Sequence, residues 1–174
     1  MRREPVHVHV DDATIVAGDP GAIIHPVWWL ANIYDGPVAY EMSLEPFSRP
    51  QRLVFAVRWY LREMNNGGHR QFYSNSTGIV WSDALAGLNE LGILRGANIL
   101  RISAERMGGT PSLDRAERNE QMDLHKPDFE DLDEAFWELQ KKVNFDECLM
   151  TYIRAQPTAF YFSGKVTRVL LPGQ

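Results

Sequence analysis

The polar side chains best placed for chemistry lie in one short stretch, residues 63–78, which reads EMNNGGHRQFYSNSTG. Glu63 is a candidate general base with His69 as a neighbour, and four amides accompany them: Asn65, Asn66, Gln71 and Asn75. A general base must lie within hydrogen-bonding distance of the proton that it removes, and spacing alone does not show this distance. One hypothesis is therefore a small-molecule-binding or hydrolytic domain whose pocket is formed by Glu63, Asn65, Gln71 and Asn75.

The same stretch also has the features of a structural connector between two helices. Asn65 to Gly68 form a helix stop, because Asn and Gly tolerate the left-handed conformation that ends a helix. The short polar side chains that follow can bond loop backbone and cap the next helix. We expect Glu63 and the amides to satisfy backbone groups that a helix stop and a helix start leave exposed.

A run of carboxylates without a cation offers a different chemistry, the attraction of basic groups. It contains six side chains: Asp128, Glu130, Asp131, Asp133, Glu134 and Glu138. As a helix the run extends about 16 Å, and a DNA duplex of that length carries about ten phosphates. A protein that binds phosphates could bind this face. The alternative is a solvated helix face, since early carboxylates and the later Lys141 and Lys142 match the helix dipole.

The remaining candidate residues indicate neither a metal site nor a nucleophile. His7 and His9 would point to one side of a strand, but two imidazoles are half of a tetrahedral site, and the other histidines lack ligand spacing. We expect both to face solvent. Cys148 lies among apolar residues, so a buried, inert thiol is expected. The sequence thus predicts no cofactor, no metal and no recognisable catalytic constellation.

Composition and charge narrow the class of protein. The chain has 174 residues, 44% of them hydrophobic, which predicts one packed domain over residues 1–174. A single cysteine and the lack of a secretory signal or a long apolar run predict a cytoplasmic protein without a membrane segment. The net charge is −5, with −4 in residues 1–50, +3 in residues 51–110 and −4 in residues 111–174. An acidic chain is a poor candidate for direct nucleic-acid binding.

Hydrophobic periodicity predicts a mainly α fold, a compact helical bundle with a small β element from the two terminal segments. Residues 1–25 form a β-like extension in which the alternating Val6, Val8 and Val10 and then residues 14–17 make a hairpin. Residues 156–174 form a β-like tail, with a turn at Ser163 and Gly164, that could pair with the first strand.

Residues 26–155 form the expected helical core. Apolar residues at intervals of three and four predict helices at 26–34, 38–44, 50–64, 80–91, 95–107, 128–143 and 146–153. Ser48 and Gln51 form a capping box for the helix at 50–64, and Ser76 or Thr77 caps the next helix. Residues 111–127 are polar and predict an exposed helix or an ordered loop.

The connector, with the apolar helices on either side of it, resembles the signature of the bacterial DNA-mimic protein family, a domain mostly of unknown function. The residues that carry the resemblance are Glu63, Met64, Asn65, Asn66, Gly67, Gly68, Gln71, Phe72, Asn75, Ser76 and Gly78. The resemblance covers residues 50–107 well and the acidic helix loosely. It implies a mainly helical fold, an acidic surface and imitation of duplex DNA at the DNA-binding face of a regulator. Residues 51–110 are net positive and cannot imitate the phosphates of DNA, so any mimicry would depend on the acidic residues of the 128–138 run.

The leading hypothesis is thus a non-enzymatic protein whose acidic face, Asp128 to Glu138, binds a basic regulator, with the signature residues serving the fold. An alternative is an immunity or antitoxin protein that blocks a nuclease toxin with the same face. A further alternative is a structural module whose basic residues meet an acidic partner or a second copy in a homodimer; these are Arg52, Arg58, Arg62 and Arg70.

Overall fold

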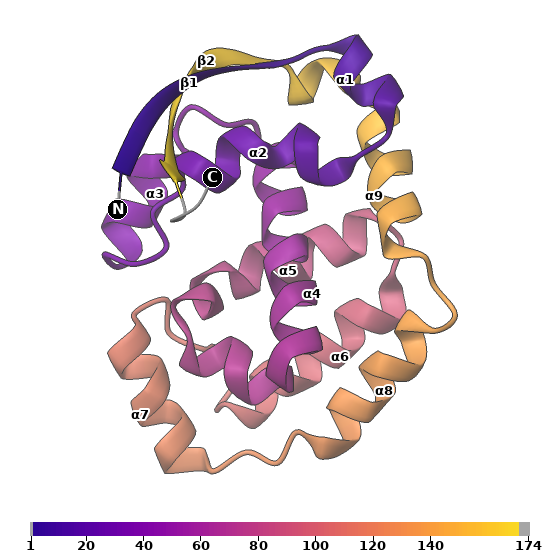
Figure 1. The fold of residues 1–174 in the computed structure, drawn as a ribbon. Coiled ribbons are helices and arrows are strands. Elements are labelled where there is room, and N and C mark those ends of the chain that lie inside the picture. The colour runs from indigo at the N-terminus through magenta and orange to yellow at the C-terminus, as the bar shows by residue number, and fades with distance from the viewer. Residues whose placement is uncertain (1, 171–174) are drawn as a thin grey trace.

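Helix α4 (Arg49–Ser74) runs through the middle of the molecule, and the other helices pack around it (Figure 1). The computed structural model describes residues 2–170, with side chains from residue 5 to residue 167. Within this part of the chain there are nine α-helices, which confirms the mainly α prediction. The other eight are α1 (Asp12–Ala17), α2 (Pro20–Leu30), α3 (Pro37–Leu44), α5 (Trp81–Glu90), α6 (Leu94–Arg106), α7 (Arg115–His125), α8 (Glu130–Gln140) and α9 (Phe145–Arg154).

The start of α4 is fixed by the predicted capping box. Ser48 accepts a hydrogen bond from the Gln51 backbone, and the Gln51 side chain accepts one from the Ser48 backbone. Both side chains also bond to the distant 3₁₀ segment Pro157–Phe160, through the carbonyls of Ala159 and Phe160. The capping box therefore joins the start of the central helix to the end of the helical core.

The predicted helix stop is a sharp break inside α4. Gly67 (φ −169°, ψ 20°) and Gly68 (φ 70°, ψ −164°) leave the helical region, and helix then resumes as far as Ser74. The connector thus contains a further helical segment that apolar periodicity did not predict. Capping by Ser76 or Thr77 was wrong, because both lie in the 3₁₀ segment Ser76–Val80 and α5 begins at Trp81 without a side-chain cap.

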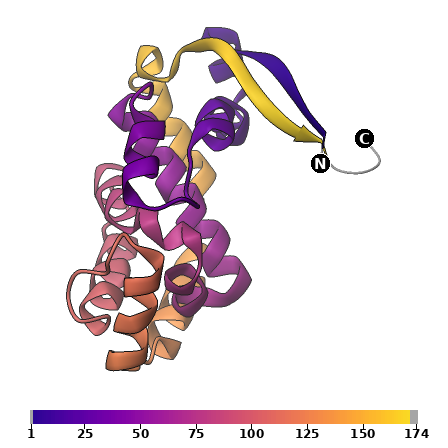
Figure 2. The same ribbon diagram turned by 90° about the vertical axis from the view of Figure 1, so that its left-hand side faces the viewer.

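The chain ends meet in a two-stranded antiparallel ribbon, as predicted. β1 (Arg2–Val10) pairs with β2 (Phe162–Leu170), with Val6 opposite Val166. Figure 2 shows this ribbon projecting from one end of the helical body. It joins segments far apart in the sequence, which a local pattern could only suggest.

Several predicted boundaries near the ends were wrong. Residues 14–17 belong to α1, because the Asp11 carboxylate accepts from the Thr14 backbone and starts a helix. The second helix begins at Pro20 instead of residue 26, with Asp19 as its cap. Ser163 and Gly164 lie within β2 instead of a turn. Residues 171–174, part of the predicted tail, are outside the described residues.

Candidate functional site

Glu63 is buried beneath the break in α4 and is bonded by three side chains of the connector. Gln71 Nε2 and Asn75 Nδ2 donate to its Oε2 at 2.7 and 3.1 Å, and Thr77 Oγ1 donates to its Oε1 at 3.0 Å. Its residual exposure is 5%. A buried carboxylate needs such donors because it has lost its water. The sequence predicts bonds to backbone, whereas the observed bonds run between side chains and tie the two parts of α4 to the following 3₁₀ turn.

A second buried network crosses from α4 to α8. Asp133 Oδ1 lies 2.5 Å from His69 Nδ1 and accepts the His69 backbone N–H at 3.0 Å. Because a carboxylate only accepts, Nδ1 carries a ring proton, and Nε2 is hydrogen-bonded to the Tyr60 hydroxyl at 2.8 Å. Burial raises the pKa of Tyr60 well above its usual value. His69 is fully buried. Its ring is hydrogen-bonded to Tyr60 and Asp133 and makes no hydrogen bond to Glu63.

Arg118 holds the far end of the connector and was missed in the sequence. Its guanidinium is fully buried and donates to the carbonyls of Tyr73, Asn75 and Ser112 at 2.7 to 2.8 Å. Burial lowers the pKa of Arg118 to about 10. The only sequence signal was its position one turn before the apolar Met122, with which it forms the buried side of α7.

Two glycines of the signature make room for these networks. A Cβ on Gly68 would lie 2.2 Å from Asp133 Oδ2, and the φ of +70° there already favours glycine. A Cβ on Gly78 would lie 2.5 Å from Arg118 Nε. Backbone approaches this close require glycine. The two positions therefore have a packing reason to be glycine that involves residues outside the signature.

The other signature residues divide between core and surface, and the predicted pocket is not assembled. Phe72 is buried in the aromatic core, whereas Asn65 and Asn66 are exposed. Asn65 lines a groove with side chains of α2 and residues 140–146, and Glu63, Gln71 and Asn75 do not line it. Of the four residues in the pocket hypothesis, Glu63, Gln71 and Asn75 are hydrogen-bonded to one another, whereas Asn65 lies apart from them on the groove.

The six carboxylates of the acidic run do not share one environment. Asp133 points inward to His69, and its side chain is 16% exposed, so its assignment to the acidic face was wrong. Asp131 forms two bonds with the Arg106 guanidinium, at 2.5 and 2.8 Å, which lower the pKa of Asp131. Glu138 pairs with Lys141 at 2.5 Å, and this hydrogen bond lowers the pKa of Glu138. Asp128 accepts from the Glu130 backbone at the start of α8, whose N-cap residue is Phe129.

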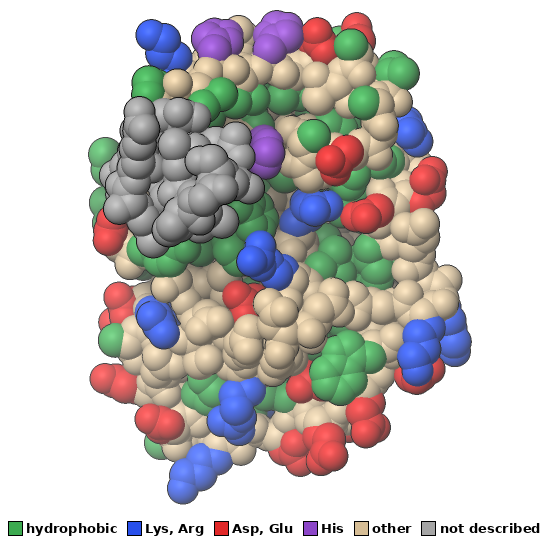
Figure 3. Space-filling view, viewed as in Figure 1, with side chains coloured by type: hydrophobic (Ala, Val, Ile, Leu, Met, Phe, Trp, Pro, Cys, Tyr) green, Lys and Arg blue, Asp and Glu red, His purple; other side chains and the backbone are tan. Residues whose placement is uncertain are grey.

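Glu130 and Glu134 remain as exposed carboxylates without an ion-pair partner among the described residues. They border a shallow hollow of about 430 Å³ that is also lined by Arg70 and Trp137. Figure 3 shows acidic side chains gathered over the lower part of this face, where α8 lies. We name the exposed residues Asp128, Glu130, Asp131, Glu134 and Glu138 the α8 acidic face. It can attract a basic group, and it carries fewer free charges than the sequence suggested.

The other candidates from the sequence lie apart from these networks. His7 and His9 are exposed on β1, as expected, and His9 lies 3.4 Å from Asp11. The described residues contain no group of three potential metal ligands. Cys148 is half-buried, which corrects the expectation of a fully buried thiol.

A family model described as "DMP19-like protein" matches residues 45–156. This match spans most of the chain and includes the connector, Arg118 and α8. The chain belongs to the DMP19-like family. This confirms the resemblance to the DNA-mimic family drawn from the connector. No curated protein and no solved structure gave a match. Among the described residues of this DMP19-like chain, no helix has the length and apolar character needed to cross a bilayer.

Proposed function

We propose that this DMP19-like protein is a non-enzymatic protein-binding protein that acts as a DNA mimic through the α8 acidic face. The partner is a basic protein that binds DNA, and the encounter takes place in the cytoplasm. The observation that carries the proposal is the exposure of Glu130 and Glu134, one turn apart on α8 and free of ion pairs among the described residues. Both lie within the family match.

The charge on this face is adequate for steering a basic partner, although it is less dense than that of DNA. Five exposed carboxylates lie along this segment, whereas a DNA duplex of the same length carries about ten phosphates. Arg106 and Lys141 partly neutralise two of them. Surface charges act through water and are screened by salt, so binding should weaken steeply as ionic strength rises.

A catalytic role has less support than binding. The candidate general bases of the connector, Glu63 and His69, are occupied by Gln71, Asn75 and Thr77 and by Tyr60 and Asp133, respectively. Buried side chains that are hydrogen-bonded in this way stabilise the fold of the connector. The immunity hypothesis uses the same acidic face, so the identity of the captured partner separates it from the mimic hypothesis.

The test is capture of partners from a cell lysate at low salt by the wild-type protein and two double variants. Glu130→Gln/Glu134→Gln removes the free charges of α8, and Glu120→Gln/Asp123→Asn removes the same charge from exposed positions of α7. We expect the wild type and the α7 variant to retain one basic DNA-binding protein, identified by mass spectrometry, and the α8 variant to lose it. Equal retention by the α8 variant would overturn the proposal. Capture of a nuclease toxin instead would establish the immunity function.

A further inference from the structure

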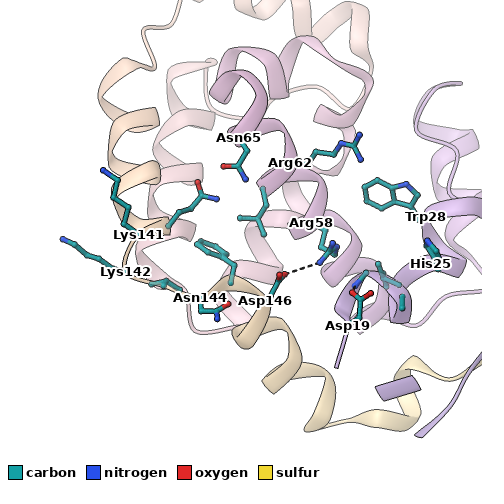
Figure 4. Close-up of a pocket in the computed structure, with 17 residues that line it drawn as sticks. Asp19, His25, Trp28, Arg58, Arg62, Asn65, Lys141, Lys142, Asn144 and Asp146 are labelled. Carbon is teal, nitrogen blue, oxygen red and sulfur yellow. Dashed lines mark hydrogen bonds and ion pairs between the residues drawn. The ribbon is translucent and has the colours of Figure 1, made fainter. Parts of the chain in front are cut away.

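A groove of about 1070 Å³ lies between α2, α4 and the α8–α9 linker, residues 141–144. The α4 side chains Arg58, Leu61 and Arg62 form its floor, at intervals that place them on one face of the helix. In Figure 4, Trp28 and His25 stand at one end, Lys141 and Lys142 stand at the other, and Arg58 lies between them. We name this the α2–α4 groove.

The α2–α4 groove is positively charged although the chain is acidic overall. Its lining contains two arginines and two lysines against two carboxylates, Asp19 and Asp146. Arg58 contacts Asp146 at 3.3 Å, but the Asp146 side chain is 71% exposed, so this pair is a weak surface interaction. Arg62 and Lys142 take part in no ion pair among the described residues. The groove therefore holds cationic groups that are available to a ligand.

The arginines are held in place by neighbouring groups. The Arg62 guanidinium lies 5.8 Å from the ring centroid of Trp28 and 5.5 Å from that of Trp59, and these two indoles stack at 4.3 Å. Cation–π contact orients the guanidinium without neutralising its charge. Arg58 lies against the first turn of α2, where a Cβ on Gly21 would be 3.3 Å from its terminal nitrogen. Preorganised guanidinium groups suit the bidentate binding of phosphate oxygens.

An apolar surface lies beside the cations and defines the rest of the ligand. Ile24, Leu61 and Val143 line the groove together with the Trp28 indole. Figure 3 shows apolar surface between the basic side chains on this face. The groove is about the size of small-molecule sites, and its lining combines apolar with polar and charged side chains.

We infer that the α2–α4 groove binds a small organic phosphate of nucleotide size, with its phosphates on Arg58 and Lys142 and its apolar body between Leu61 and Trp28. This site lies beside the α8 acidic face, which it meets at the Lys141–Glu138 pair, and its arginines belong to the positively charged residues 51–110. The chain thus presents two surfaces of opposite charge, one for a basic protein and one for a small anion.

The test is titration of the full chain with ATP as the probe, followed by calorimetry and by the tryptophan fluorescence that Trp28 reports. Arg58→Gln/Lys142→Gln removes two cations of the groove. Arg101→Gln/Lys165→Gln is the matched control, because it removes the same charge from exposed positions outside the groove. We expect the groove variant to weaken ATP binding more than about tenfold and the control to stay within about twofold of the wild type. Inorganic pyrophosphate, which lacks the apolar body, should bind more weakly than ATP.

Three results would overturn the inference. The first is no ATP binding at millimolar concentration, and the second is equal weakening of ATP binding by the groove variant and the control. The third is displacement of ATP by a hexaglutamate peptide of equal or higher affinity, which would assign the groove to an acidic protein segment. If the double variant fails to fold by circular dichroism, Lys142→Gln alone serves, because this exposed ammonium is in no ion pair of the described residues. Neither variant alters Glu130 or Glu134, so a negative result for ATP binding would not change the outcome expected in the capture experiment.

Discussion

Glu63 and Glu130 are the same side chain in two opposite settings. Glu63 is buried in the connector and accepts three hydrogen bonds, whereas Glu130 stands exposed on α8 without an ion-pair partner among the described residues. A buried carboxylate that is fully bonded stabilises one backbone arrangement, and its loss leaves the donors unsatisfied. An exposed carboxylate contributes little to stability and keeps its charge available for a partner. The two regions therefore divide the tasks of folding and binding.

Asp133 shows where the two regions meet. It lies in the acidic run of the sequence, yet its carboxylate bonds to His69 across the break in α4. The connector thus positions α8, and α8 carries the exposed charges. Substitutions in the connector should change stability strongly, and substitutions of the α8 acidic face should change stability little.

The largest loss of stability is expected for Arg118→Met. Arg118 is the buried basic residue that bonds the connector, as Glu63 is its buried acidic residue. The substitution removes the donor of the Tyr73 and Ser112 carbonyls and one of the two donors of the Asn75 carbonyl, which also accepts from the Gly78 backbone N–H at 3.2 Å. Because each unsatisfied buried group costs about 1–3 kcal/mol, we expect a loss of about 4 kcal/mol in the free energy of unfolding. Urea denaturation measures this loss. A change below about 1 kcal/mol would show that Arg118 does not hold the connector.

Gly68→Ala should be the next most damaging change. The Cβ would meet the Asp133 carboxylate at 2.2 Å, in a backbone conformation that side chains rarely adopt. We expect a loss of about 3 kcal/mol in the free energy of unfolding. Gly92→Ala is a control for positive φ alone, since its φ of +73° is similar and nothing beyond its chain neighbours lies within 4 Å of the added Cβ. The control should lose about 1 kcal/mol; equal losses would remove Asp133 from the explanation.

Glu63→Gln compared with Glu130→Gln tests the division most directly at the level of stability. At the buried position, the amide introduced by the substitution would turn a donor toward the donors of Gln71, Asn75 or Thr77. We expect a loss of about 2 kcal/mol for the buried site and a change within about 0.5 kcal/mol for the exposed site. Thermal and urea unfolding give both values. If the exposed substitution were the more costly one, the division between the regions would be wrong.

The smallest effect concerns charges within the α8 acidic face. The hydrogen bond from Arg106 lowers the pKa of Asp131, so Arg106→Gln should raise that pKa toward its ordinary value of 3.8. Because the folded pKa is lowered, the associated stability is present above the ordinary pKa and is lost as the pH falls through the lowered value. Carboxylate titration by NMR measures the shift. Lys141→Gln should move the pKa of Glu138 and leave that of Asp131 unchanged; movement of both would indicate long-range effects.

The sequence predicted what depends on local pattern. Apolar spacing and the Ser48–Gln51 capping box predicted the start of α4, and two adjacent glycines predicted its break. The roles of Arg118 and Asp133 could not be predicted in the same way, because their connector partners lie 43 to 64 positions away along the chain. The residue type alone also does not show whether a charged side chain is buried or exposed. For the same reason the α2–α4 groove, assembled from three separate segments, had no signal beyond the positive charge of residues 51–110.

If the α8 acidic face imitates DNA, this protein and duplex DNA must compete for the basic partner that it captures. Fluorescence anisotropy of labelled duplex bound to that partner would be followed as the protein is added. We expect that the wild type displaces the duplex, that displacement weakens as salt rises, and that Glu130→Gln/Glu134→Gln requires more than about tenfold higher concentration. A duplex that stays bound while the protein joins the complex, or equal displacement by the α8 variant, would contradict this expectation.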